Sequence, residues 1–420
     1  MLKTPLHKFH LEYHAKMVEF TGWEMPMLYT SIREEHEQVR TSGGVFDVSH
    51  MGRVKVQGRH ARKLLERVCS RRITDMQTGQ CRYSLVCNER GGVRDDVLVY
   101  KLDDADYLVV VNASNREKLL GHFEDVRSGA AGGAGHRLEA GATGGGGAGH
   151  RLEAGATGRG GGEELKVTIE DQTESTAMVA VQGPKVMEMV ANFSKEIPAL
   201  KRYRFTVKNL LVMKVLVSRT GYTGEDGVEA ILPAGAVNMA LQLLLKDVDM
   251  TQAQALIKPA GLGARDTLRM EAGMPLYGQE LGEDICALSC GVDFAITMDK
   301  HEAERGERFI GQDALEKIIA EGGPSRRIVG LALEGRRTPR PGHAVLASGA
   351  GGEPIGRVTS GCLSPTLGHP IAMALVDSAH AEVGTTLAVD AGRTQLEAEV
   401  VKLPFYKAAK PKPAATGASA

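Results

Sequence analysis

The sequence lacks several features that would place it in common functional classes. Its 420 residues carry a formal net charge of -1, so no overall field attracts nucleic acid and any basic site must be local. No apolar run approaches the ~18 residues of a membrane-spanning helix. The first residues show neither a signal peptide nor a long Arg/Ser-rich presequence, which leaves targeting open. We therefore expect neither a nucleic acid nor a membrane as partner.

Metal and dinucleotide signatures are also missing. The six cysteines are scattered, and only Cys286 and Cys290 lie close together in the sequence. A single C-x3-C pair is a weak metal signal, so we expect buried, reduced thiols and no metal. No G-x-G-x-x-G stands between a predicted strand and a predicted helix, which argues against a dinucleotide domain. GLGAR at 261–265 holds only a lone G-x-G.

What the chain does contain is an internal duplication within residues 128–162. The string GGAGHRLEAGATG occurs at 132–144 and again at 146–158. Two copies are too few for a solenoid, and so much glycine and alanine cannot build a core. We therefore expect a flexible low-complexity insertion in a surface loop.

Elsewhere the patterns predict mixed helix and strand structure. Five segments have helical periodicity or caps: 31–42, 59–70, 114–127, 184–194 and 234–248. A polar, helical connector is expected at 299–325. Beyond it, 326–403 holds short β-rich runs separated by turns, a spacing typical of a small antiparallel barrel or sandwich. The tail, 408–420, is expected to be disordered.

The stretch GGVRDDVLVY, residues 91–100, is a predicted turn and strand with two adjacent aspartates. Side chains alternate across a strand. The odd-numbered face is apolar apart from Asp95 and should meet the core. The even-numbered face, with Asp96, Leu98 and Tyr100, suits the wall of a pocket. We interpret Asp95 as a cap of the turn.

Neighbouring segments bring further polar groups to the even-numbered face. If the next hairpin pairs Tyr100 with Leu108, Asp96 stands opposite Asn112, whereas a one-residue slip would reverse this. The preceding arm returns Tyr83 to the same region. From these residues alone, a turn role and a site role for Asp96 are equally open.

Several longer strings carry a resemblance to a known family. They are FTGWEMPMLY (20–29), VFDVSHMG (45–52), SRTGYTGEDGVE (218–229), GLGARDTLRMEAGMPLYGQEL (261–281) and GRVTSGCLSPTLG (356–368). Together with the aspartate strand, their order and spacing closely resemble the aminomethyltransferase, or T-protein, family of the glycine cleavage system. The resemblance covers nearly the whole chain except residues 128–162 and the tail.

The resemblance implies an α+β fold of three domains, arranged as a cloverleaf around a central folate channel. Residues 1–298 would form two interleaved α+β subdomains, and 299–325 the connector. Residues 326–407 would form a C-terminal antiparallel β-barrel, which agrees with the pattern of short strands there.

The resemblance also implies a reaction. The methylene of an aminomethyl group on the lipoyl arm of H-protein passes to tetrahydrofolate, and ammonia leaves. The products are 5,10-methylenetetrahydrofolate and dihydrolipoyl H-protein. Tetrahydrofolate is then a co-substrate, and the lipoyl group belongs to the partner. The compartment would be the mitochondrial matrix in a eukaryote, which we favour, or the cytoplasm in a bacterium.

Motif matching assigns the site residues. Asp96 matches the catalytic carboxylate beside the folate nitrogens, where we favour positioning and charge stabilisation over proton transfer. The folate- and substrate-binding matches are Met51, Tyr83, Tyr100, Asn112, Tyr222, Glu229, Arg265 and Tyr406. A carboxylate such as Glu229 accepts the pterin amino group and ring N–H together. A guanidinium such as Arg265 suits the anionic folate tail, unless it pairs with Asp266 or Glu271 on its helix.

Other residues have competing interpretations. His36 lies on a charged helix face and is expected to be solvated or structural, whereas His50 is placed to line the channel. Phe294 stands where the family usually has a tryptophan. Five arginines are candidates for meeting an acidic partner, although a solvated face is commoner: Arg33, Arg40, Arg53, Arg59 and Arg62.

Two other functions fit the resemblance less well. Folate-linked demethylases carry an FAD domain with a Gly-rich fingerprint, and this chain starts directly at the folate module. A non-enzymatic, folate-binding iron–sulfur assembly family of similar fold places a cysteine in a KGCYxGQE string. The corresponding segment here, AGMPLYGQEL, has no cysteine.

Overall fold

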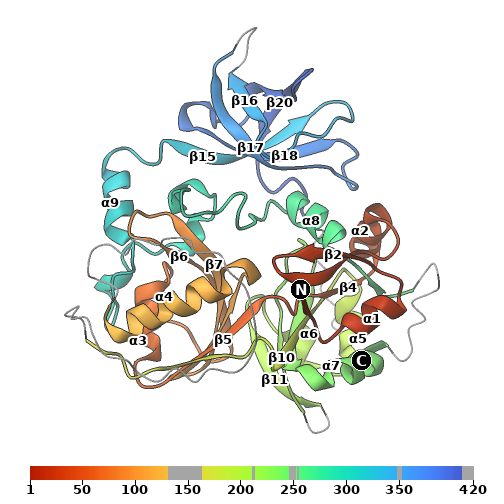
Figure 1. The fold of residues 1–420 in the computed structure, drawn as a ribbon, viewed down its shortest axis with the longest axis vertical. Coiled ribbons are helices and arrows are strands. Elements are labelled where there is room, and N and C mark those ends of the chain that lie inside the picture. Colours follow the sequence, from red (N-terminus) through yellow and green to blue (C-terminus); the bar gives the residue numbers. More distant parts are fainter. Residues whose placement is uncertain (131–162, 211–212, 246–251, 253–254, 348–351, 409–420) are drawn as a thin grey trace, which may run out of the picture.

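The structure is a computed structural model with three bodies (Figure 1). It describes residues 1–130, 163–210, 213–245, 252, 255–347 and 352–408. The expected insertion at 128–162 and the expected tail at 408–420 lie almost entirely outside these residues. Among the residues described, no helix is both long and apolar enough to cross a membrane.

The first unit is a five-stranded antiparallel sheet in the order β6-β7-β8-β5-β9. Its strands are β5 (Gly52–Gln57), β6 (Gln80–Cys87), β7 (Val93–Asp103), β8 (Asp106–Val111) and β9 (Thr168–Asp171). Its helices are α3 (Ala61–Val68) and α4 (Arg116–Ser128). Both helices bury their apolar stripes against the sheet, together with Val97 and Val99 of β7. The odd-numbered face of β7 thus meets the core, as predicted.

The second unit is a six-stranded sheet in the order β11-β12-β13-β10-β4-β14. Its strands are β4 (Gly44–Asp47), β10 (Thr176–Gln182), β11 (Phe205–Leu210), β12 (Met213–Ser218), β13 (Gly227–Pro233) and β14 (Lys258–Pro259). Its helices are α5 (Val186–Ala191), α6 (Glu196–Ala199) and α7 (Val237–Leu245). Because β4 precedes the whole first sheet and pairs with β10, which follows it, the chain interleaves the two units.

A small sheet in the order β1-β3-β2 and three helices complete this side of the molecule. They are β1 (Leu2–Lys3), α1 (His7–Glu12), β2 (Lys16–Phe20), β3 (Trp23–Leu28), α2 (Ile32–Thr41) and α8 (Leu262–Glu271). The α2 helix begins where predicted, because the Ser31 side chain accepts a hydrogen bond from the Glu34 amide at 3.2 Å.

The third body is a closed antiparallel barrel in the order β15-β18-β17-β16-β19-β20, drawn at the top of Figure 1. Its strands are β15 (Arg326–Leu333), β16 (Ala344–Ala347), β17 (Pro354–Leu363), β18 (Pro370–Asp377), β19 (Thr386–Asp390) and β20 (Gln395–Val401). The connector contributes α9 (Gln312–Ala320). The α+β class and the C-terminal antiparallel barrel are confirmed.

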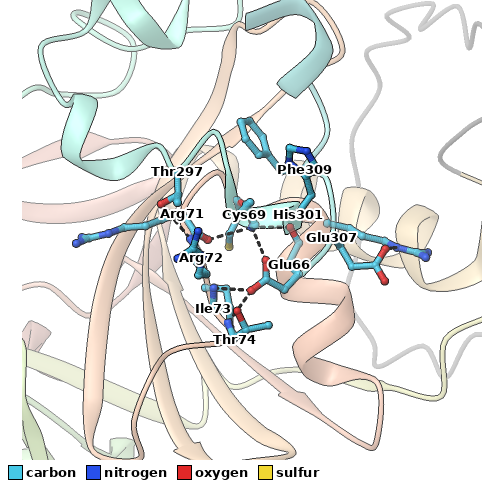
Figure 2. Close-up of polar contacts among 12 residues, drawn as sticks. Glu66, Cys69, Arg71, Arg72, Ile73, Thr74, Thr297, His301, Glu307 and Phe309 are labelled. Atoms are coloured by element: carbon cyan, nitrogen blue, oxygen red, sulfur yellow. Dashed lines mark hydrogen bonds and ion pairs between the residues drawn. The ribbon is translucent and has the colours of Figure 1, made fainter. Parts of the chain in front are cut away.

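A fully buried lysine, Lys300, ties the connector to the first unit, and Figure 2 shows Glu66, Cys69 and Arg71, the residues that it contacts. Lys300 Nζ lies 2.8 Å from the Glu66 carboxylate and donates to three backbone carbonyls, those of Glu66, Cys69 and Arg71, at 2.8, 2.7 and 3.1 Å. Burial lowers the pKa of Lys300, and the Glu66 carboxylate opposes this. The contacts fix the chain that follows α3 against the connector.

Candidate active site

A cavity of ≈ 1100 Å³ is lined by residues of all three bodies. Strands β7 and β13, helix α8 and two barrel segments, 338–341 and 360–363, all contribute side chains. The volume slightly exceeds the ~300–1,000 Å³ typical of small-molecule sites, so the cavity has room for a long ligand.

The aspartate strand forms one wall of this cavity. Tyr100 pairs with Leu108, so the expected register is confirmed. Asn112 follows the end of β8, and its side-chain amide donates to Asp96 Oδ1 at 2.7 Å. The Tyr83 hydroxyl donates to Asp96 Oδ2 at 3.1 Å. Both carboxylate oxygens of Asp96 are therefore held from neighbouring strands.

Asp95 does not cap the turn as we expected. It is fully buried and accepts three hydrogen bonds, from the Asn112 backbone at 3.0 Å, the Asn112 side chain at 2.8 Å and the Asn115 side chain at 2.6 Å. The turn is capped instead by Asn88, which accepts from the Gly92 amide at 2.9 Å. Asp95 thus fixes the start of the segment after β8.

Burial raises the pKa of both adjacent carboxyls, and the charge of Asp96 raises the pKa of Asp95 further. Hydrogen bonds from Asn112 and Tyr83 oppose the rise in the Asp96 pKa. The pKa of Tyr83 is itself raised by burial and by Asp96, so its hydroxyl stays protonated as a donor. Asp96 is consequently a half-buried carboxylate at the cavity wall that is more basic than a fully exposed one.

A second polar group occupies the cavity wall at β13 and α8. Glu229 accepts from the Thr220 hydroxyl at 2.5 Å. The Arg265 guanidinium lies 4.8 Å from the Tyr222 ring centroid. Burial lowers the pKa of Arg265, whereas the charge of Glu229 raises it. Arg265 Nη1 is buried without a hydrogen-bond partner among the residues described, so it is a donor available to a ligand.

The alternative pairing of Arg265 on its own helix is wrong. Asp266 is ion-paired with Arg269 at 2.8 Å. Glu271 is ion-paired with Arg40 at 2.8 Å. Neither carboxylate is left to neutralise Arg265, because each already has its own guanidinium.

The histidines separate as cavity and framework residues. His50 lines the cavity beside Met51, and burial lowers its pKa to about 4, so the ring is neutral. Its Nδ1 has no hydrogen-bond partner within the described part of the chain. His36 is buried rather than solvated, with Nδ1 2.8 Å from the Thr267 hydroxyl and Nε2 3.1 Å from the Glu271 carboxylate.

Two predicted site residues lie outside the cavity lining. Tyr100 is buried in the core, with its hydroxyl 3.2 Å from Ser218 Oγ and its ring 5.4 Å from that of Phe205. The Tyr406 ring lies 4.1 Å from the Arg40 guanidinium carbon. The other seven predicted residues line the one cavity: Met51, Tyr83, Asp96, Asn112, Tyr222, Glu229 and Arg265.

Motif matching missed three further residues at the site. Tyr203 and Arg340 line the cavity from loops, and Asn115 supports Asp95. Loop residues of this kind give no periodic signal in the sequence.

The five arginines proposed to meet an acidic partner do not form one face. Arg40 is buried against Glu225 and Glu271. Arg53 is also buried, and its guanidinium donates to backbone carbonyls, including that of Thr176 at 2.9 Å. Arg40 and Arg53 therefore have framework roles, whereas Arg33 and Arg59 are exposed and Arg62 is half-buried.

Metal binding has no visible basis in the described residues. No group of three or more His, Cys, Asp or Glu side chains there is arranged to hold a metal ion. The six cysteines are free thiols, five of them buried.

Comparisons with known proteins define the class of this chain. The model of the GCVT N-terminal domain matches residues 6–300, and that of the glycine cleavage T-protein C-terminal barrel domain matches residues 326–407. The chain belongs to the glycine cleavage T-protein family.

Individual relatives match over nearly their whole length. An aminomethyltransferase of Bacillus subtilis (strain 168) is 38% identical over 410 residues, covering 97% of this chain and 100% of the relative. One of Saccharopolyspora erythraea is 40% identical, covering 96% and 98%. The crystal structure of the glycine cleavage system aminomethyltransferase T of Bartonella henselae is 27% identical with a TM-score of 0.80, covering 97% and 98%. These relatives are bacterial and give no support to a mitochondrial location.

Proposed function

We propose that this chain transfers the methylene of an aminomethyl group from the lipoyl arm of H-protein to tetrahydrofolate. The observation that carries the proposal is that Asp96, Glu229 and Arg265 line the same cavity. Within it, Asp96 accepts hydrogen bonds from Tyr83 and Asn112. Family membership and relatives named aminomethyltransferase support the same reaction.

Glu229 and Arg265 have the chemistry to bind the reduced pterin. A carboxylate accepts two adjacent N–H groups as a two-pronged, charge-assisted pair. Arg265 Nη1 offers a donor that nothing in the described chain satisfies. Because this guanidinium is buried against Tyr222 and within the field of Glu229, we assign it to the pterin end rather than to the anionic tail.

We place Asp96 beside the methylene carbon whose bonds are exchanged in the reaction. The C–N bond to ammonia and the C–S bond to the arm break, and two bonds from the folate nitrogens to the methylene carbon form. The two folate N–H protons are balanced by one on the departing ammonia and one on the released thiol. Expulsion of ammonia leaves an electron-poor carbon on sulfur, which a fixed carboxylate stabilises. We propose this positioning and electrostatic role for Asp96.

Neither rival function gains support. The relatives of high identity are named aminomethyltransferase, and the segment that carries a cysteine in the iron–sulfur assembly family has none here. The partners we propose are therefore lipoylated H-protein and tetrahydrofolate. The bacterial relatives favour the cytoplasmic alternative for the compartment.

The direct test is ammonia release from aminomethyl-loaded H-protein, measured with and without tetrahydrofolate. The transferase predicts strong acceleration by tetrahydrofolate and formation of 5,10-methylenetetrahydrofolate in equal amount. Ammonia release that does not respond to tetrahydrofolate would contradict the proposal.

A further inference from the structure

Basic and aromatic side chains gather at the edge of the cavity, outside the residues assigned to folate. We call Arg71, Arg202, Tyr203 and Phe294 the basic rim. Tyr203 lines the cavity, and the Phe294 ring lies 5.7 Å from the ring of Tyr83, the donor to the catalytic carboxylate. The basic rim is therefore continuous with the site.

Both aromatic residues of the basic rim are presented to solvent. Phe294 is 58% exposed and Tyr203 is 46% exposed. The Tyr203 backbone is left-handed, with φ of 60°, a conformation that costs free energy for a bulky side chain. Its N–H donates to the Arg219 carbonyl at 3.1 Å, and its carbonyl accepts from the Cys81 amide at 3.0 Å. These bonds hold the ring in its exposed position.

The positive charge of the basic rim is uncompensated. Among the residues that the structure describes, the guanidinium groups of Arg71 and Arg202 have no hydrogen-bond or ion-pair partner. Both arginines act electrostatically on Tyr203, where they oppose the rise in its pKa that burial causes. Asp75, a carboxylate in the field of Arg71, is already ion-paired with Arg82. The exposed Arg202 and the half-buried Arg71 are thus cations that accompany the exposed aromatic rings.

The backbone of Arg71 is fixed by the buried lysine of the connector. Lys300 Nζ donates to the Arg71 carbonyl at 3.1 Å, and Lys300 is in turn paired with Glu66. In Figure 2 the Arg71 side chain extends away from this buried pair. Its guanidinium carbon lies 5.9 Å from the centroid of the Phe294 ring. A rigid backbone lowers the entropic cost of binding through such a side chain.

We propose that the basic rim docks an acidic face of the protein that carries the lipoyl arm. The inference rests on the proposed function, because an arm attached to a protein brings that protein's surface to the cavity edge. Arginine and exposed aromatic residues are enriched in protein interfaces, where aromatic anchors often contribute most of the binding energy. Unpaired cations beside them select a partner of opposite charge and accelerate its encounter.

The test reverses the rim charges in the full chain, as the double variant Arg71→Glu with Arg202→Glu. Its matched control is Arg393→Glu, an exposed arginine on the turn between β19 and β20 of the barrel. We expect the KM for aminomethyl-loaded carrier to rise about tenfold or more at low salt, with kcat and the folate KM unchanged. The difference should shrink as salt increases, because exposed charges are screened.

Two results would overturn the proposal that the basic rim docks the carrier protein. One is an unchanged KM for the carrier. The other is an equal loss with an aminomethyl group on free dihydrolipoamide, which has no protein surface to dock. Carrier binding measured by fluorescence anisotropy requires no chemistry, so it separates the two proposals. If binding of the carrier depends on the basic rim but no ammonia is released, the docking proposal stands and the transferase proposal fails. If ammonia is released but binding does not depend on the basic rim, the transferase proposal stands and the docking proposal fails.

Discussion

The side-chain amide of Asn112 donates to Asp96 at 2.7 Å, and the same group lies 2.8 Å from Asp95. One amide therefore positions the carboxylate that we propose to be catalytic and links it to the buried carboxyl group of Asp95. The pair is held by strand register, because Asn112 follows β8 at the position opposite Asp96. Four predictions concern the cavity walls that carry Asp96 and Glu229.

Asp96→Asn should retain folate binding and lower turnover by about one to several orders of magnitude, since it removes charge while keeping shape. Ammonia release under saturating folate and H-protein measures kcat, and folate titration measures binding. An unchanged kcat would contradict the electrostatic role proposed for Asp96. Asp377→Asn, which alters a carboxylate on barrel strand β18, serves as the control.

The pH dependence follows from the same carboxyl. Because burial raises the pKa of Asp96, the ionised form is lost as pH falls through a range higher than that of an exposed aspartate. We expect kcat to decline in mildly acidic solution and the acid limb to vanish in Asp96→Asn. An acid limb at the ordinary carboxyl range, near ~4, would contradict a raised pKa.

Asp95→Asn tests the buried neighbour through stability. The folded-state pKa of Asp95 lies above its unfolded value, so its contribution to stability is fully present below the unfolded pKa. That contribution is lost as pH rises through the raised folded pKa. Denaturant unfolding between pH 5 and 8 should therefore show a loss of stability with pH in the parent chain that is smaller in the variant. Identical slopes would show that Asp95 does not titrate there.

Glu229→Gln should weaken folate binding by about tenfold to a hundredfold, equivalent to the ~1.5–3 kcal/mol of a charged hydrogen bond. Calorimetric titration of the chain with tetrahydrofolate gives the affinity directly. Glu397→Gln, an exposed change on β20, should leave it unaltered. Equal affinities for all three proteins would remove Glu229 from the pterin site.

Lys300→Met should destabilise the fold by about 3–5 kcal/mol, because it leaves the Glu66 carboxylate buried without its cation. Adding Glu66→Gln should restore much of the loss, since the amide oxygen can still accept from the Ile73 and Thr74 backbones, each at 2.6 Å in the parent. Denaturant unfolding of the single and double variants measures both effects. A double variant as unstable as the single one would argue for packing instead of charge.

Alternation along β7 predicted which side chains line the cavity only for the part of the strand that borders the cavity. Leu98 and Asp96 line the cavity as alternation requires. Tyr100, on the same face, instead packs against Phe205 of the second unit. An eleven-residue strand is long enough to meet two neighbours, and alternation cannot say which one covers each end.

Side-chain pairing across the fold was equally hidden from the sequence. Spacing on α8 made Asp266 a plausible partner for Arg265, yet Asp266 pairs with Arg269. The basic rim joins Arg71, Tyr203 and Phe294 from three distant segments, which no spacing rule connects. Such groupings depend on tertiary packing, whereas helix caps and strand register are largely local.

The interleaving of β4 has a consequence for synthesis of the chain. Its sheet is completed only by β14, whose Lys258 and Pro259 pair with Gly44 and Val45. The ribosome must therefore translate more than two hundred further residues before β4 acquires its last neighbour. The barrel strands, by contrast, emerge consecutively from Arg326 to Val401. Nascent chains stalled before residue 258 should thus expose an unfinished sheet edge to chaperones, while the barrel can close as soon as it leaves the exit tunnel.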